Sequence, residues 1–245
     1  GIVIDYYPPE NGTYIGAGSI IILPNGDYLA THDQYPGTIA TSIFRSQDNG
    51  ITWSTLTKLP DQYESTLFVH DGDLYLIGGF HQFDPNVPDP NLAEYVAIRK
   101  STDGGLTWTT PVDASTGLIT QPGLYNCAPT PVLVHNGRIW RAFEEVDVTI
   151  PSGLSQEYRA MMVSAPEHTD LLNASNWTVS NTLLMKDYIP NTGWLEGNAV
   201  AASDGSVKNI LRVGGMTNKA AVIQVSSNGT TLSFSPQTLI DFPGG

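Results

Sequence analysis

The chain has 245 residues, of which 40% are apolar and only 14% charged, with 24 glycines and 17 prolines. This composition is typical of a turn-rich β protein and argues against a disordered chain or a helical bundle. The formal net charge of −13 argues against nucleic acid as a partner, because phosphate binding needs a cationic surface. No apolar run approaches the roughly 18 residues that cross a bilayer, so we expect no membrane span.

The single cysteine, Cys127, rules out an intrachain disulfide and a cysteine-based zinc site. We expect no metal and no cofactor. The chain begins at Gly1 and not at a methionine, which is typical of a processed or trimmed start. We expect a secreted, periplasmic or cell-surface protein.

Four hairpins recur along the chain, each made of two short apolar runs joined by an Asn-Gly or Asp-Gly turn, the strongest short-range hairpin signal. Their turn glycines are Gly26, Gly72, Gly137 and Gly205, with spacings of 46, 65 and 68 residues. Such spacing suits a repeated four-stranded unit with variable loops. The paired runs are 19–23 with 28–33, 65–70 with 74–79, 130–135 with 139–145, and 193–200 with 210–213.

A second hairpin follows each of these, with first strands expected at 41–45, 95–99, 158–164 and 221–225. Four strands in each of four units predict an all-β fold, a β-propeller of four-stranded antiparallel blades. We expect a single domain over 1–245, with blades at about 14–58, 62–112, 125–180 and 194–240.

The second hairpins of the first two units carry the motif Ser-x-Asp-x-Gly-x-Thr-Trp, at 46–53 and 101–108. In such a turn the aspartate accepts from backbone amides, the glycine takes positive φ and the tryptophan packs between blades. We therefore interpret Asp48, Trp53, Asp103 and Trp108 as structural. The motif resembles the Asp box (BNR repeat) of the sialidase, or neuraminidase, superfamily, whose propellers have six blades. That resemblance implies that this propeller is incomplete, and that missing C-terminal blades or self-association close the ring; a closed four-bladed propeller is the alternative.

Counting along the four hairpins places eight positions at one rim of the predicted propeller: Ala17, Tyr63, Ala128, Glu196, Asp33, Gly79, Glu144 and Arg212. Further polar and aromatic candidates lie close to them in sequence: His32, Tyr125, Asn126, Glu145 and Trp194. Arg159 begins a third strand at the same rim and could pair with Glu144 or Glu145. Acids, an arginine and aromatic rings gathered on one rim indicate an acid/base and sugar-stacking site.

Glu196 and Arg212 are the sharpest candidates, because antiparallel pairing places them near each other at the open end of their hairpin. The resemblance implies roles for both. In sialidases a glutamate at this point activates a tyrosine nucleophile, and an arginine on the next strand clamps the substrate carboxylate. The same resemblance makes Asp33 the expected acid/base. The first blade departs from the family, since Tyr14-Ile15-Gly16-Ala17 lacks its arginine, so we expect altered sugar specificity.

We therefore predict a glycoside hydrolase that cleaves a terminal sugar, acidic or neutral, from a glycan or polysaccharide. Asp33, Glu196 and Glu144, which shares the repeat position of Asp33, are the predicted catalytic residues. Two alternatives stay open. A polysaccharide lyase would use His32 or a tyrosine to abstract a proton beside a uronate carboxylate, and a non-catalytic propeller would bind carbohydrate or act as a scaffold. Structural roles also stay open: an ion pair for Glu196 and Arg212, a loop cap for Asp33, and packing for His32.

Overall fold

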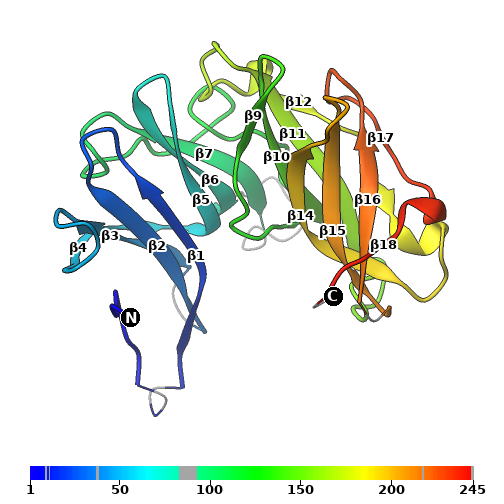
Figure 1. Ribbon diagram of the computed structural model, residues 1–245, viewed down its shortest axis with the longest axis horizontal. Coiled ribbons are helices and arrows are strands. Elements are labelled where there is room, and N and C mark those ends of the chain that lie inside the picture. Colours follow the sequence, from blue (N-terminus) through cyan, green and yellow to red (C-terminus); the bar gives the residue numbers. More distant parts are fainter. Residues whose placement is uncertain (9, 11, 37–38, 83–92, 217, 244–245) are drawn as a thin grey trace. The chain divides into compact units, whose positions relative to one another are not determined.

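The computed structural model describes residues 1–8, 10, 12–36, 39–82, 93–216 and 218–243. Throughout these residues the chain is all-β, with four antiparallel sheets and short 3-10 turns (Figure 1). The sheets fall into two compact units, Gly1–Pro122 and Gly123–Gly245. Within the described ranges, no helix has the length and apolar character that a membrane crossing requires.

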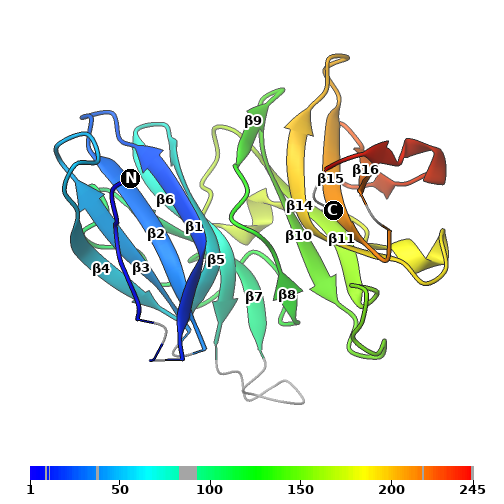
Figure 2. The same ribbon diagram turned by 60° about the horizontal axis from the view of Figure 1, so that its bottom comes forward.

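Unit 1 holds one sheet of four strands and one of three strands. Figure 2 shows the strands of the first sheet side by side in the order β1-β2-β3-β4, and the second sheet has the order β5-β6-β7. In the second sheet, the described residues after β7 supply a bridge between Ala97 and Leu118 where we expected a fourth strand. The strands are β1 Tyr14–Ile22, β2 Tyr28–Tyr35, β3 Ala40–Ser46, β4 Ser54–Pro60, β5 Gln62–His70, β6 Asp73–His81 and β7 Glu94–Ser101.

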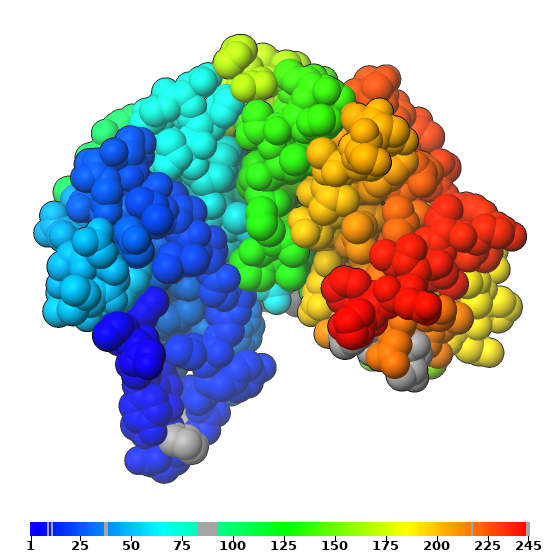
Figure 3. Space-filling model, viewed as in Figure 1, coloured from blue at the N-terminus to red at the C-terminus, as the bar shows by residue number. Residues whose placement is uncertain are grey.

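The core of unit 1 lies where its two sheets face each other. Leu29, Ile43 and Leu76 are fully buried there, and the ring of Trp108 packs against the same cluster. Strand β1 also turns apolar side chains outward, since Ile20 is 60% and Ile22 is 59% exposed. This strand forms part of the surface of unit 1, in blue in Figure 3.

Unit 2 holds two sheets whose main strand orders are β12-β11-β10-β8 and β14-β15-β16-β17, with β9, β13 and β18 paired beside them. Strands β10, β11, β14, β15 and β16 are long, and the others are short. Their bounds are β8 Tyr125–Asn126, β9 Leu133–His135, β10 Arg138–Val146, β11 Tyr158–Pro166, β12 Thr178–Val179, β13 Leu183–Leu184, β14 Gly193–Ala201, β15 Val207–Gly214, β16 Lys219–Val225, β17 Leu232–Ser233 and β18 Ile240–Asp241.

The predicted run at 130–135 is shorter in the structure, where β9 covers only Leu133–His135. Strand β8 pairs separately with the other end of β10, and residues 127–132 between β8 and β9 belong to no strand. Pro129 and Pro131 lie in this segment. A proline has no N–H to donate to a sheet ladder, which explains the interruption. The buried guanidinium of Arg141 supports the segment instead, by donating to the carbonyl of Ala128 and, at 2.6 Å, to the hydroxyl of Thr130.

All four predicted hairpins are present, but their turns are of two kinds. The pairs Asp71-Gly72 and Asn136-Gly137 have positive φ at both positions, as a two-residue type I′ turn requires. The turns at Gly26 and Gly205 are longer, because Leu23 pairs with Asp27 and Ala202 with Ser206 across them, both at 2.8 Å from N to O.

An extra residue interrupts the pairing of three first strands at one place in each. In β1, β5 and β14 the residue in the left-handed region is Ala17 (φ 53°), Glu64 (φ 48°) and Glu196 (φ 61°). A bulge of this kind bends the strand and re-aims a side chain. The register shifts lie between Gly16 and Ser19, Tyr63 and Thr66, and Leu195 and Asn198.

The two Asp-containing turns have the predicted local structure. Asp48 accepts from the N–H of Thr52 at 2.8 Å and Asp103 from that of Thr107 at 2.9 Å. Hydrogen bonds from those same threonines lower the pKa of each aspartate to about 2. The indole N–H groups of Trp53 and Trp108 donate back to the turn, to the carbonyls of Gly50 (3.0 Å) and Gly105 (2.9 Å).

The bulge in β5 leaves no room for a side chain on the facing strand. A Cβ at Gly78 would lie 2.7 Å from the Cα of Ser65 and 2.7 Å from the carbonyl oxygen of Tyr63. We expect Gly78→Ala to lower the free energy of unfolding by about 1–3 kcal/mol, the usual cost of overpacking, as measured by urea denaturation. Gly18→Ala is the control, because its Cβ would make an ordinary 3.5 Å contact. Equal stability of the two variants would contradict this account of the bulge.

Candidate functional site

Glu196 and Arg212 lie together in unit 2, at the open end of the β14–β15 hairpin. The carboxylate Oε2 of Glu196 is 3.3 Å from Nη1 of Arg212, and their side chains are 40% and 48% exposed. The expected proximity of the pair is thus confirmed. The bulge in β14 sets this geometry, since Arg212 pairs in register with Leu195 and Glu196 occupies the extra position. Both charged groups can therefore reach a ligand from solvent.

A cavity of about 430 Å³ adjoins this ion pair in unit 2. Its size falls within the range of about 300–1,000 Å³ that is typical of small-molecule sites. The lining combines apolar and polar side chains: Ala128, Thr130, Glu196, Asn198, Ile210, Leu211, Arg212, Ala220 and Phe242. Among the lining groups, Oδ1 of Asn198 is buried and accepts no hydrogen bond in the described structure. Sequence analysis did not single out Asn198 or Phe242.

Glu144 lies behind the bulge and is fully buried in unit 2. Its Oε1 accepts from the backbone N–H of Gly197 at 2.8 Å, and its Oε2 accepts from the side-chain amide of Asn126 at 2.9 Å. Burial raises the pKa of this carboxyl, and these hydrogen bonds oppose the increase only in part. Glu144 thus holds the backbone of the residue that follows Glu196.

Asp33 occupies the equivalent place in unit 1, at the end of β2. Its carboxylate is 3% exposed. Oδ1 accepts from the Thr41 hydroxyl at 2.7 Å, and Oδ2 accepts from the backbone N–H of Glu64 and from the Tyr35 hydroxyl at 3.3 Å. Burial is the main cause that raises its pKa. Asp33 therefore binds the bulge of β5 as Glu144 binds the bulge of β14.

Glu64 is a candidate that sequence analysis missed. Counting eight residues back from the turn gave Tyr63. The count missed the bulge by one residue because the turn of this hairpin is shorter than the turn at Gly205. The structure places Glu64, and not Tyr63, at the position that Glu196 takes in unit 2. Aligning Tyr63-Glu64-Ser65-Thr66 with Leu195-Glu196-Gly197-Asn198 would have revealed it.

The remaining candidates of unit 1 have clear packing partners. Nε2 of His32 is 2.8 Å from Oδ2 of Asp5, and its ring stacks on Phe44 with 5.0 Å between centroids. The ring of Tyr63 lies over Gly79, where a Cβ would come within 2.2 Å of it. His32 is thus held between the N-terminal segment and the sheet.

In unit 2 the other rim candidates contact neighbouring residues of the protein. Asn126 supports Glu144, and Tyr125 pairs in register with Glu145 and is largely buried. Arg159 lies opposite Glu145 in the ladder, yet its guanidinium binds the carboxylate of Asp147. The expected pairing of Arg159 with Glu144 or Glu145 is therefore corrected: Glu144 is buried, and Asp147 lies beyond the end of the strand within reach.

Trp194 is placed in the core and not at an opening. Its ring is fully buried and makes an edge contact with Phe234, at 5.2 Å between centroids. It belongs to the main apolar cluster of unit 2, because neighbouring side chains of a strand point to opposite faces and Trp194 takes the inner one. It therefore offers no sugar-stacking surface in this structure.

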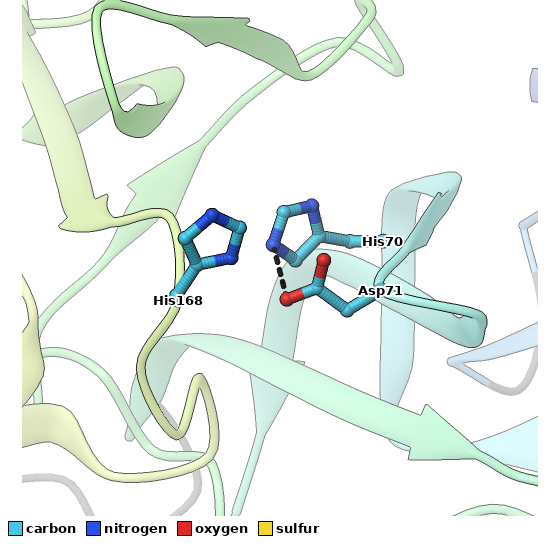
Figure 4. Close-up of side chains that lie close together, drawn as sticks. All are labelled: His70, Asp71 and His168. Atoms are coloured by element: carbon cyan, nitrogen blue, oxygen red, sulfur yellow. Dashed lines mark ion pairs between the residues drawn. The ribbon is translucent and has the colours of Figure 1, made fainter.

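His70 lies at the turn end of β5, at the far end of that strand from the bulge. Figure 4 shows its ring beside the carboxylate of Asp71, with Nε2 3.4 Å from Oδ2. In unit 2, His135 is likewise at a turn, where Nε2 lies 2.9 Å from the carbonyl oxygen of Gly205. Both histidines thus belong to turn structure.

The four sheets of antiparallel strands define the fold class as a β-propeller of four-stranded blades. No protein-family model matches the sequence, and no curated protein matches it. Solved structures do resemble it. One is a protein of unknown function from Dyadobacter fermentans, with a TM-score of 0.63 and 16% identity over 95% of this chain and 71% of that one.

Two further neighbours are glycosidases. A Hadza microbial sialidase has a TM-score of 0.63 and 14% identity, over 91% of this chain and 47% of its own. The α-L-arabinanase of Penicillium chrysogenum, complexed with arabinobiose, has a TM-score of 0.53 and 17% identity, over 90% of this chain and 63% of its own. The chain therefore spans about half to two thirds of the length of these enzymes and shares their fold.

Burial of Glu144 makes stability depend on pH in a defined direction. A raised pKa favours the protonated native state, so the contribution of Glu144 is complete below its ordinary pKa of 4.5 and is lost as pH rises through the raised value. Glu144→Gln stays neutral. We expect the parent's stability to decline relative to this variant between pH 4 and pH 8, as measured by urea denaturation. If the stability of the parent instead rises relative to that of the variant between pH 4 and pH 8, the raised pKa of Glu144 is contradicted.

Proposed function

We propose that this protein is a glycoside hydrolase acting on a terminal sugar of a glycan or polysaccharide. The observation that carries the proposal is the half-exposed pair of Glu196 and Arg212 beside the cavity in unit 2. Fold neighbours named as a sialidase, an arabinanase and an α-L-arabinofuranosidase support the class of reaction. The two Asp-containing turns support a sialidase-like ancestry within that class.

Glu196 is the proposed general base of the site. Its carboxylate is exposed enough to take a proton from a water molecule or from a hydroxyl nucleophile, while its backbone is fixed by the bulge. A positioned carboxylate that accepts a proton in this way typically contributes about 10²–10⁴-fold to rate. Glu196 therefore supplies the chemistry that hydrolysis needs on one side of the glycosidic bond.

Arg212 is the proposed anchor for the sugar. A guanidinium presents donors in a fixed planar fork, which matches a carboxylate or a pair of vicinal hydroxyl groups. Its distance of 3.3 Å from Glu196 leaves a loose ion pair that a ligand can replace. An acidic or hydroxyl-rich sugar fits this chemistry, with Ile210 and Phe242 offering apolar contact to the ring.

The test is sugar release from a mixed panel of glycans and polysaccharides. We expect Glu196→Gln to lower kcat a hundredfold or more, because the amide cannot accept the proton. We expect Arg212→Lys mainly to raise KM, because lysine keeps the charge but loses the fork. Asp204→Asn is the matched control, since Asp204 is an exposed residue at the turn end of the same hairpin.

Several results would overturn the proposal. Sugar release that survives Glu196→Gln in folded protein would remove this site from the reaction. Sugar binding without release would favour a carbohydrate-binding propeller. An unsaturated product that absorbs in the ultraviolet would identify a lyase.

A further inference from the structure

Two hydrogen-bonded arrangements in this chain are alike, one in each unit. In unit 1, Asp33 at the end of β2 accepts from the backbone N–H of Glu64. In unit 2, Glu144 at the end of β10 accepts from the backbone N–H of Gly197, next to Glu196. In both, a buried carboxylate of one sheet holds the left-handed bulge of the next sheet's first strand, and the bulge carries a glutamate.

We infer that Asp33 and Glu144 are positioning residues that hold these bulges and thereby aim the carboxylates of Glu64 and Glu196. The inference rests on the proposed function, because aim matters only if Glu196 and Glu64 meet a substrate. It also identifies Glu64 as the glutamate that occupies the bulge of β5, the position that Glu196 occupies in β14. A non-glycine residue with positive φ is strained and persists only where its surroundings enforce it.

Burial distinguishes positioning from direct chemistry. Glu144 is completely buried and Asp33 is 3% exposed, and each of their four carboxylate oxygens already accepts a hydrogen bond. By contrast, the Glu196 side chain is 40% exposed. In unit 2 the solvent-facing member of the arrangement is thus Glu196, and the buried Glu144 acts through it.

Conservative substitution separates the two roles, because an amide oxygen can still accept from the bulge N–H. In Glu144→Gln the new carbonyl can accept from Gly197, and a turned Asn126 can accept from the new amide group. In Asp33→Asn the amide can donate to the Thr41 hydroxyl, which can in turn donate to the carbonyl of Gln62, 3.1 Å away. An alanine at either position removes the acceptor entirely.

The experiment measures kcat, KM and the pH profile of sugar release for the parent, Glu144→Gln, Glu144→Ala, Asp33→Asn and Asp33→Ala, with Glu157→Gln as control. Glu157 is a largely buried residue whose carboxylate accepts from the N–H of Gly153 in its own loop and not from a bulge N–H. Crystal structures of the same variants report the φ angle of Glu196, which is 61° in the parent, and that of Glu64, which is 48°.

For positioning residues we expect each alanine variant to lose the positive φ at its bulge, and Glu144→Ala to lose a hundredfold or more in kcat. Each amide variant should retain kcat within about tenfold, with an unchanged pH profile and a positive φ at the bulge. If an amide variant loses as much as its alanine counterpart while the bulge stays intact, the buried acid does the chemistry itself and the inference is wrong. Full activity in Glu144→Ala would overturn it as well.

The crystal structures keep this outcome separate from that of the proposed function. If the parent releases no sugar, the proposed hydrolase fails, and the aim of Glu64 and Glu196 at a substrate fails with it. If the parent is active but the bulges keep positive φ in the alanine variants, the hydrolase stands and the positioning role is overturned.

Discussion

A hydrogen bond from the backbone N–H of a left-handed bulge to a buried carboxylate is the interaction on which the proposed site depends. A glutamate in the left-handed conformation costs of order 1–3 kcal/mol, and without this hydrogen bond nothing would offset that cost at the bulge. A backbone N–H left buried without an acceptor would add a similar penalty. Glu144 removes that penalty at Gly197, so the position of Glu196 depends on a residue that solvent does not reach.

The same constraint explains the division of labour between the acidic residues of unit 2. Glu144 has its two oxygens committed and its pKa raised by burial, so it is suited to structure. Glu196 lies on the neighbouring strand β14, next to the residue that Glu144 binds, but its side chain meets solvent and Arg212. The bulge separates the two roles because it turns the N–H of Gly197 toward the buried Glu144 and leaves the side chain of Glu196 at the surface.

Much of the fold could be predicted from the sequence, because its signals are local. The Asn-Gly and Asp-Gly turns gave all four hairpins, and the Asp-containing motifs gave turns whose hydrogen bonds are those expected. Division into blades followed from the spacing of these turns. We expected the rim positions of both units to surround one opening. Because these residues belong to separate units, this stays a prediction.

The site was less predictable, because it depends on packing between segments far apart in sequence. Counting from the turn located Glu196 but missed Glu64, since the two turns differ in length. No local pattern distinguishes the buried Glu144 from the half-buried Glu145, or shows that Arg159 binds Asp147. The sequence pattern predicted Trp194 as an aromatic residue at the rim. Its burial and its contact with Phe234, 40 residues further along the chain, show that it belongs to the core.

Amide hydrogen exchange at Gly197 tests the central claim most directly. The account predicts that this N–H is strongly protected in the parent, that Glu144→Gln keeps most of the protection, and that Glu144→Ala loses it while amides in the middle of β15 stay protected. Rapid exchange of Gly197 in the parent, or equal protection in all three proteins, would contradict the claim that a buried carboxylate holds the bulge.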